Sequence, residues 1–301
     1  MLHPPNPARG ALCAIGASLM MALMAAAIRI ASQELPNEML VFLRNSFGLL
    51  VLLPWLRGDR RLLATTQWRA HLLRSLAGLA AMYCFFYALA ELDLAKAMLL
   101  NFSAPLYIAP IAFLWLGEPL SRPLLAAAIV GFLGVALVLR PGVGFFSSAA
   151  IWGAISGVLA ALAMVSLRSM AHSEPTRRTV FYFSLIGAVV SSLPALYRWQ
   201  TPSLRGLMLM LFAGFCATQG QLLLTHGYNL APAARIGPYT YATVLFASLL
   251  GWWLWREVPD AMTFAGASLI ILSGVLAIQR GRFPTGTEEG IVPGMRWSKR
   301  R

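Results

Sequence analysis

The chain has 301 residues, of which 58% are hydrophobic and only 12% are charged, and its mean hydropathy is +0.69. Soluble domains are about 45–50% apolar and about 25% charged, so these values exclude an ordinary soluble fold and indicate an integral membrane protein. The net charge of +13 would favour nucleic acid as a partner of a soluble protein, but in a membrane protein it reports orientation. We therefore expect the lipid bilayer, and no nucleic acid, as a partner.

Ten apolar runs follow one another along the chain, each long enough for a helical span of about 20 residues. Arg9 and the first run resemble a signal peptide, but nine further runs follow, so we interpret the first run as a retained span. The polar, basic stretch 283–301 is expected to be a disordered cytoplasmic tail. The expected helices cover residues 10–32, 38–56, 71–91, 95–116, 122–140, 149–170, 178–197, 205–227, 233–255 and 261–280.

The second half of the chain repeats the first at an offset of 139 residues. Each unit has five spans. Because this number is odd, the second unit crosses the membrane in the opposite orientation, which makes an inverted repeat. The sequence therefore predicts an all-α integral membrane fold of ten transmembrane helices in two inverted five-helix repeats, residues 1–142 and 143–282. The offset aligns Arg29 with Arg168, Pro36 with Pro175, Gly48 with Gly187, and Glu118 with Glu257.

Lys and Arg are distributed unevenly between the two sides of the membrane. If both termini are cytoplasmic, 17 of them fall on the cytoplasmic side and six on the external side, with Arg44 set aside inside a span. Short cytoplasmic loops carry the excess of basic residues. We therefore expect a multi-pass protein with both termini in the cytoplasm.

Transport is the leading class of function, because inverted repeats suit alternating access to a site near the middle of the bilayer. The chain contains no HExxH or Walker A sequence, and the serine of GAISG at 153–157 is misplaced for a nucleophile elbow. Its three cysteines lie inside apolar runs and form no CxxC pair, so neither a disulfide nor a zinc site is expected. We expect no enzyme activity, no catalytic residues, no metal and no cofactor.

The fourth and ninth spans contain residues that interrupt a helix. Pro105 and Pro110 each remove a backbone donor, so the fourth helix should kink or open, and exposed backbone in a membrane is tolerated only beside protein or a water-filled cavity. We predict a substrate cavity between the two spans; the alternative is that the prolines only bend helices and the tyrosines lie at the membrane interface. The candidate residues are Asn101, Tyr107, Tyr239, Thr240 and Tyr241.

The third and eighth spans add polar candidates for the same cavity. Tyr83 and Tyr87 share a face of the third span because they are four residues apart, and Gln219 and His226, seven apart, share a face of the eighth. Polar side chains in a span normally face the bundle interior. The alternatives are hydrogen bonds between helices and, for His226, an interfacial anchor instead of a gating or pH-responsive role.

Charged side chains are scarce in the predicted spans. Arg44 lies about six residues into the second span, where it either extends to the membrane surface or binds a substrate carboxylate. All 11 acidic residues lie at helix ends, in loops or in the tail, so no coupling carboxylate is expected at mid-membrane. His71 is likewise assigned to a loop. Further candidates, with ordinary packing as the alternative, are Ser18, Trp152, Ser156 and Met164.

The stretch from Tyr87 to Gly142 resembles the EamA domain of the drug/metabolite transporter superfamily. Its marks are a Tyr-Ala-Leu end to helix three, an alanine-rich start to helix four, Pro105, Leu-Gly-Glu-Pro and a glycine-bearing fifth helix. The second half repeats these marks loosely, with Arg256-Glu257 in place of Gly-Glu and Val244 where a second proline is usual. Arg44 also matches the basic residue that these proteins often carry in helix two.

The resemblance implies two inverted five-helix repeats around a central cavity, in a bacterial inner membrane. It implies export of a small molecule, an amino acid or similar metabolite, from the cytoplasm, and the aromatic residues fit the branch that exports aromatic amino acids. The competing classes are an efflux pump for lipophilic cations, which should place a carboxylate in its cavity, and a membrane-embedded enzyme acting on lipid. The oligomeric state is left open, and a monomer is compatible with the sequence.

Overall fold

The computed structural model describes residues 7–56, 64–116, 122–139, 147–170, 174–230 and 237–280, and its regular structure over these residues is helical. The predicted ten-span, all-α fold is confirmed, with the fourth and ninth spans each built from two pieces. The predicted tail 283–301 and the boundary between residues 142 and 143 lie outside the described residues. The elements are α1 (Pro7–Ala31), α2 (Asn37–Leu56), α3 (Trp68–Glu91), α4 (Leu94–Asn101), α5 (Ala104–Leu116), α6 (Arg122–Leu139), α7 (Ser148–Ser169), α8 (Thr176–Tyr197), α9 (Leu204–Leu230), η2 (Gly237–Tyr241), α11 (Ala242–Trp255) and α12 (Ala261–Arg280).

Helix length follows from the uninterrupted apolar runs. At about 1.5 Å per residue, a helix of about 20 residues crosses the roughly 30 Å hydrocarbon core of a bilayer. Five of the helices are long and apolar enough to do so alone by length and composition, namely α1, α3, α7, α8 and α9. The shorter pieces cross as pairs, α4 with α5 and η2 with α11.

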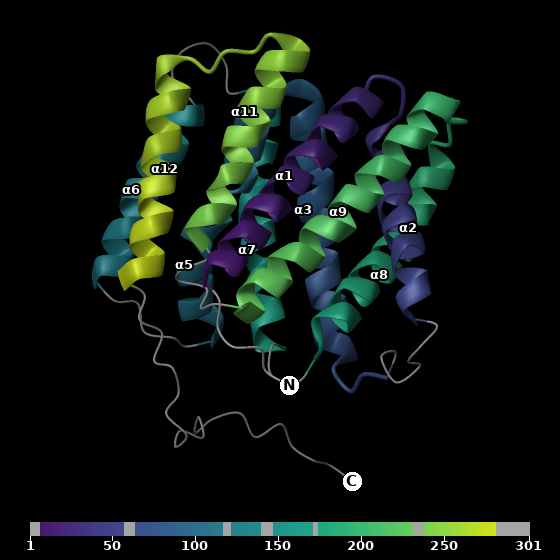
Figure 1. The fold of residues 1–301 in the computed structure, drawn as a ribbon, viewed down its shortest axis with the longest axis horizontal. Coiled ribbons are helices and arrows are strands. Elements are labelled where there is room, and N and C mark those ends of the chain that lie inside the picture. The colour runs from purple at the N-terminus through teal and green to yellow at the C-terminus, as the bar shows by residue number, and fades with distance from the viewer. Residues whose placement is uncertain are drawn as a thin grey trace.

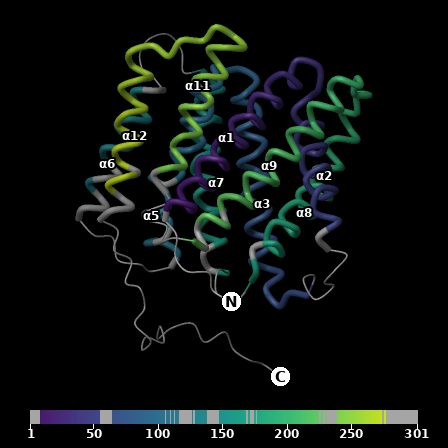
Figure 2. Tube along the Cα trace, viewed as in Figure 1, coloured from purple at the N-terminus to yellow at the C-terminus, as the bar shows by residue number. Residues whose placement is uncertain are grey.

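The packing of the helices has the symmetry of the repeat. α1 packs on α9, and their counterparts α7 and α3 pack on each other; α2 packs on α8 and α6 on α12, each pair being one helix and its own counterpart (Figure 1). The two repeats are therefore interlocked through their first three helices. We call the end of the bundle where α1 begins and α12 ends the termini face, and the other end the opposite face (Figure 2).

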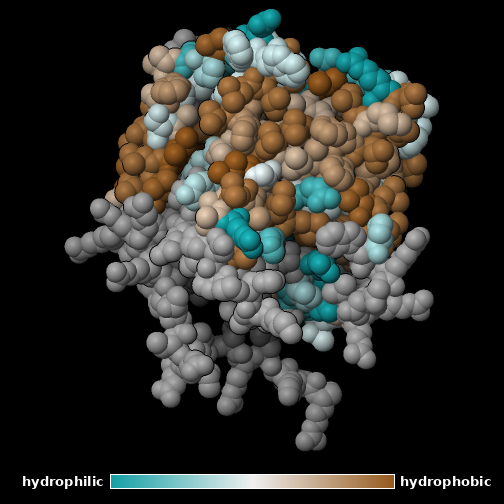
Figure 3. Space-filling view, viewed as in Figure 1, coloured by the Kyte–Doolittle hydropathy of each residue, from teal (hydrophilic) through white to brown (hydrophobic). Residues whose placement is uncertain are grey.

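The outer surface of the bundle is apolar. Hydrophobic side chains cover most of the described surface in Figure 3, with hydrophilic ones along its upper edge and in patches in its lower part. Leu114, Leu193 and Trp253 are 80%, 74% and 68% exposed. Such exposure would be a liability in water, but it is expected of side chains that face lipid. Inside, small residues bring helices together: a Cβ atom on Gly134 of α6 would lie 2.8 Å from the carbonyl oxygen of Gly266 on α12.

Candidate functional site

The fourth span breaks between α4 and α5, next to Pro105 as predicted, whereas Pro110 lies inside α5, which continues past it. α4 ends at Asn101, and the chain resumes a helix at Ala104. The half-buried Asn101 donates from Nδ2 to Ser156 Oγ on α7 at 3.0 Å, and the Ser103 hydroxyl donates to the carbonyl oxygen of Leu100 at 2.6 Å. The Ser103 hydroxyl thus gives a backbone carbonyl beside the break a partner, as backbone inside a membrane requires, and the Asn101 amide connects the end of α4 to α7.

The ninth span is irregular in a different way, because a 3₁₀ helix runs directly into its α-helix. The short 3₁₀ helix η2 precedes α11, and the hydroxyl of Ser18 on α1 donates to the carbonyl oxygens of Tyr239 and Thr240 at 3.2 and 3.3 Å. Thr243 adds a bond from Oγ1 to the Thr240 carbonyl at 2.7 Å. A serine from the first helix of the other repeat therefore contacts each irregular stretch, Ser156 at the break in the fourth span and Ser18 at η2 in the ninth.

The tyrosines of these two spans lie in different surroundings. Tyr107 on α5 is half-buried and meets the Phe132 ring of α6 edge-on, with 5.3 Å between ring centres. Tyr241 is 6% exposed within the main hydrophobic core, whereas Tyr239 is 44% exposed. Tyr239 and Thr240 therefore contact α1 through their backbone carbonyls, whereas the Tyr241 side chain is packed in the core.

The candidates on α3 and α9 are spread along the bundle. Tyr83 packs against the core, and its hydroxyl is buried without a hydrogen-bond partner; its carbonyl oxygen accepts from Asn37 Nδ2 at 2.9 Å. Tyr87, one turn nearer the opposite face, is 37% exposed. Gln219 is half-buried, and His226 is exposed near the end of α9, a position that suits an interfacial anchor. One cavity lined by all eight candidates stays a prediction.

Arg44 does not extend to the membrane surface. Its side chain on α2 is only 6% exposed, donates from Nη1 to Asn45 Oδ1 at 3.0 Å and lies against the Phe183 ring of α8, 5.5 Å from the ring centre. The snorkelling interpretation of Arg44 is therefore wrong, because Asn45 and α8 hold its guanidinium inside the bundle.

A second buried arginine, Arg74 of α3, escaped the sequence analysis, which counted it among the charges at the membrane surface. Its guanidinium lies 4.6 Å from the centre of the same Phe183 ring. A Cβ atom on Gly78 would lie 2.9 Å from Arg74 Nη1 and 2.7 Å from Phe183 Cε2. A glycine four residues after an arginine in an apolar run is the signal that could have identified this position.

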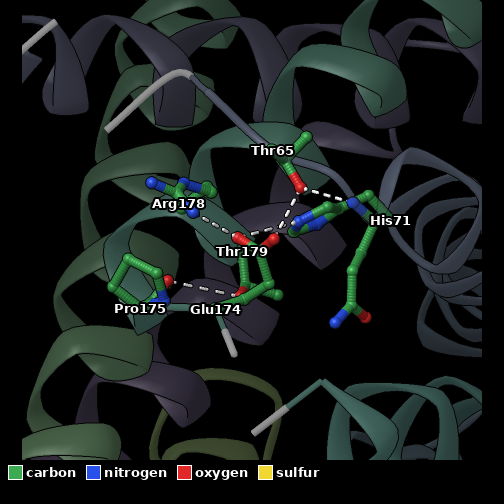
Figure 4. Close-up of polar contacts among 7 residues, drawn as sticks. Thr65, His71, Glu174, Pro175, Arg178 and Thr179 are labelled. Atoms are coloured by element: carbon green, nitrogen blue, oxygen red, sulfur yellow. Dashed lines mark hydrogen bonds and ion pairs between the residues drawn. The ribbon is translucent and has the colours of Figure 1, made fainter. Parts of the chain in front are cut away.

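Four polar residues form a cluster at the termini face, which we call the termini-face cluster: Thr65, His71, Glu174 and Arg178 (Figure 4). Glu174 Oε1 accepts from Thr65 Oγ1 at 2.6 Å, and Oε2 accepts from Arg178 Nη1 at 2.7 Å. His71 Nε2 lies 3.5 Å from Oε2, and the side chains of His71 and Glu174 are 1% and 2% exposed. The cluster connects the loop before α3 to the start of α8, one from each repeat.

The termini-face cluster corrects two expectations from sequence. His71 lies in the first turn of α3 and stacks on Tyr182 with 4.6 Å between ring centres, so it is not a loop residue. Glu174, although it lies in a loop, turns inward. Burial alone would raise the pKa of this carboxyl, but the hydrogen bonds from Thr65 and Arg178 and the charge of Arg178 hold it below its ordinary value.

Acidic residues at the opposite face also connect the repeats. Ser203, which caps α9 by accepting from the Gly206 backbone N–H at 3.0 Å, donates to both carboxylate oxygens of Glu34 at 2.9 Å. Glu257 Oε2 accepts from the Leu94 backbone N–H at 2.9 Å, at the start of α4, and Oε1 pairs with Arg29 at 2.5 Å. Glu257 therefore satisfies a helix end of the first repeat, as a structural carboxylate does.

Comparison with known proteins identifies the family. The model of the EamA-like transporter family matches residues 8–140 and 147–279. The chain belongs to this family. EamA-like proteins are part of the drug/metabolite transporter superfamily, so the chain is a multi-pass membrane transporter. One protein of known crystal structure shares the fold, with a TM-score of 0.64 at 21% sequence identity. The match spans 90% of this chain and 97% of that protein's chain.

Several relatives of this EamA-like transporter carry names that state a substrate. It is 31% identical to the pseudopaline exporter CntI of Pseudomonas aeruginosa, over 88% of this chain and 94% of that protein. It is 27% identical to the S-adenosylmethionine uptake transporter of Rickettsia bellii, over 76% and 79% of the two chains. The riboflavin transporter of Vibrio cholerae is 26% identical over 89% and 92%. These substrates differ widely, and the names include both export and uptake.

Proposed function

We propose that this transporter exports amino acids or similar small metabolites across a bacterial inner membrane by alternating access, with the termini face in the cytoplasm. The observation that carries the proposal is the pair of irregular spans, the fourth, which breaks between α4 and α5, and the ninth, which includes the 3₁₀ helix η2. Asn101 at the first break bonds to Ser156, and Ser18 bonds to the Tyr239 and Thr240 carbonyls at the second. Discontinuous helices from two inverted repeats are the arrangement in which many transporters hold a substrate near the middle of the bilayer.

The two breaks provide polar groups suited to an amino acid. Opened helix ends present backbone C=O dipoles, which favour the ammonium group of an amino acid. Asn101 adds a neutral amide at the same level, and Gln219 a second one on α9. A substrate bound there would contact both repeats at once. When the repeats rock about the site, the substrate would be exposed first to one side of the membrane and then to the other.

The direction of transport is supported by one relative and tested by experiment. The 31% identical relative is named as an exporter, and the excess of basic residues at the termini face favours a cytoplasmic location for that face. Inside-out vesicles that contain the purified transporter should therefore accumulate labelled substrate from outside, since their outer surface corresponds to the cytoplasmic side.

The test is uptake of a panel of labelled amino acids by inside-out vesicles, with and without a pH gradient. We expect uptake of at least one amino acid, and we expect Asn101→Ala and Gln219→Ala to weaken it at least about tenfold, because each loses a hydrogen bond to a charged group. Thr201→Ala, at an exposed loop position of the opposite face, serves as the control. Absence of uptake for every member of the panel would refute amino-acid transport, and wild-type behaviour of both variants would refute this site.

A further inference from the structure

Two arginines in the interior of the bundle share one aromatic ring. The guanidinium carbons of Arg44 and Arg74 lie 5.5 and 4.6 Å from the centre of the Phe183 ring. The two carbons are therefore separated by no more than the sum of these distances, about 10 Å. Positive charges this close repel each other, and burial removes most of the water that would screen them. An arrangement of this kind is costly unless an anion lies near both.

The described part of the chain does not supply that anion. Neither Arg44 nor Arg74 has a carboxylate within 4.0 Å among the residues that the structure describes. Two acidic side chains near these helices have basic partners of their own, since Glu38 of α2 pairs with Arg198 at 3.6 Å and Glu174, in the loop before α8, pairs with Arg178. A buried charge is normally paired. The positive charge of the two arginines thus lacks a described counterion.

Each guanidinium has at least one N–H donor that makes no hydrogen bond. The Nε atoms of Arg44 and Arg74 are both buried and have no hydrogen-bond partner. Arg44 uses Nη1 for Asn45, and the recorded contact of Arg74 is with the flat face of Phe183. A contact with a ring face uses none of the guanidinium N–H groups in a conventional hydrogen bond, and these groups can bind a carboxylate with two parallel bonds.

The site is a feature of the duplicated fold, although only one repeat supplies the charge. Arg44 and Phe183 are equivalent under the 139-residue offset, and they meet because α2 packs on its counterpart α8. Gly78 leaves room for Arg74 beside the ring, since a Cβ atom there would collide with Phe183. The first repeat thus provides two cations and the second provides the surface on which they lie.

We infer that Arg44 and Arg74 together bind a carboxylate of the transported molecule, so that the substrates are carboxylic acids, including amino acids, and not organic cations. The inference rests on the proposed function and narrows it. A carboxylate between the two guanidinium groups accepts hydrogen bonds from both and neutralises their repulsion. A lipophilic cation would meet the same repulsion that the arginines exert on each other.

The test compares acids with their amides. Thermal unfolding of the purified transporter in detergent is measured with three matched pairs: phenylalanine and phenylalaninamide, benzoate and benzamide, succinate and succinamide. At least one acid is expected to raise the midpoint of unfolding while its amide does not. Arg44→Gln and Arg74→Gln should raise the half-saturating concentration of that acid at least about tenfold. Arg205→Gln removes an exposed charge at the start of α9 and should leave it unchanged.

Lysine variants keep the test decisive if a glutamine variant does not fold. If either glutamine variant fails to elute as a folded protein, Arg44→Lys and Arg74→Lys retain the charge and lose only the forked geometry, and the same tenfold weakening is expected of them. The inference is overturned if no acid raises the midpoint of unfolding, or if each acid and its amide raise it alike. It is also overturned if variants of both Arg44 and Arg74 keep the wild-type half-saturating concentration of the acid.

The outcomes separate this inference from the proposed function. If acids stabilise the protein through the two arginines while no amino acid is transported, amino-acid export fails and the carboxylate site stands. If an amino acid and its amide are transported equally well, the carboxylate site fails and export stands.

Discussion

The two repeats share a backbone design and differ in the side chains at equivalent positions. At the first break an amide, Asn101, bonds to the Ser156 hydroxyl, whereas at the second a hydroxyl, Ser18, bonds to two backbone carbonyls. At the termini face Glu174 is buried among basic and hydroxyl groups, whereas at the opposite face Glu34, one residue before the position equivalent to Glu174, bonds to an exposed serine. The backbone therefore provides the symmetric frame that rocking requires, and the side chains give its two sides different chemistry and different strength.

The largest loss of stability is expected at the termini face, where the carboxylate Glu174 is buried. Glu174→Gln removes the charge that Arg178 and His71 surround, and breaking a buried pair leaves an uncompensated charge at a cost of about 3–5 kcal/mol. Glu34→Gln removes a carboxylate in an exposed setting and should cost no more than about 1 kcal/mol. Thermal unfolding of both variants in detergent measures the contrast. Equal losses of stability would show that the two faces are held equally firmly.

The pH dependence of the same variant follows from the lowered pKa of Glu174. A group whose pKa is lower in the folded state contributes stability above its ordinary pKa, here 4.5, and this contribution is lost as the pH falls through the folded value. The difference in unfolding midpoint between wild type and Glu174→Gln should therefore be present at pH 6 to 8 and shrink below pH 4.5. A difference that grows in that acidic range would contradict the assigned contacts.

Substitutions at the irregular stretches of the fourth and ninth spans should have smaller effects. One substitution should reduce transport, and the other should reduce stability. Asn101→Ala leaves Ser156 bonded to the Gly153 carbonyl at 2.6 Å, so the loss should appear in transport and hardly in stability. Ser18→Ala removes a donor from two backbone carbonyls and should lower stability by about 1–3 kcal/mol. Uptake and thermal unfolding of both variants separate the two effects. If Asn101→Ala proves to be the less stable variant, the amide has a structural role and not the proposed one.

The smallest effect concerns the motif that ends the fourth and ninth spans. Arg256 has φ of 60°, in the left-handed region that costs most residues about 1–2 kcal/mol, and the equivalent residue of the first repeat is Gly117. Arg256→Gly should therefore raise the stability by up to about 1 kcal/mol in thermal unfolding. Arg198→Gly, which also follows the last residue of a helix but at φ −109°, should lower it. A loss in both variants would mean that the Arg256 side chain matters more than its backbone.

The sequence predicted the fold well because each span is a local property of about 20 residues and because the repeat duplicates the hydrophobic pattern. It also predicted the break at Pro105, since a missing backbone donor acts within one helical turn. It could not predict that Arg44, Arg74 and Phe183 meet, because this depends on how α2, α3 and α8 pack. The burial of Glu174 was missed for a related reason: two of its partners, Thr65 and His71, belong to the other repeat, more than 100 residues away.

Alternating access between the two repeats is the central claim, and distances across both faces test it most directly. Spin labels, introduced after replacement of the native cysteines, can be placed at the exposed positions Arg69 and Arg177 of the termini face and, in a second sample, at Glu91 and Arg205 of the opposite face. Pulsed electron resonance then measures each distance with and without a transported substrate. The account predicts that substrate shifts the two distance distributions in opposite directions. Distributions that both stay unchanged, or that widen or narrow together, would contradict it.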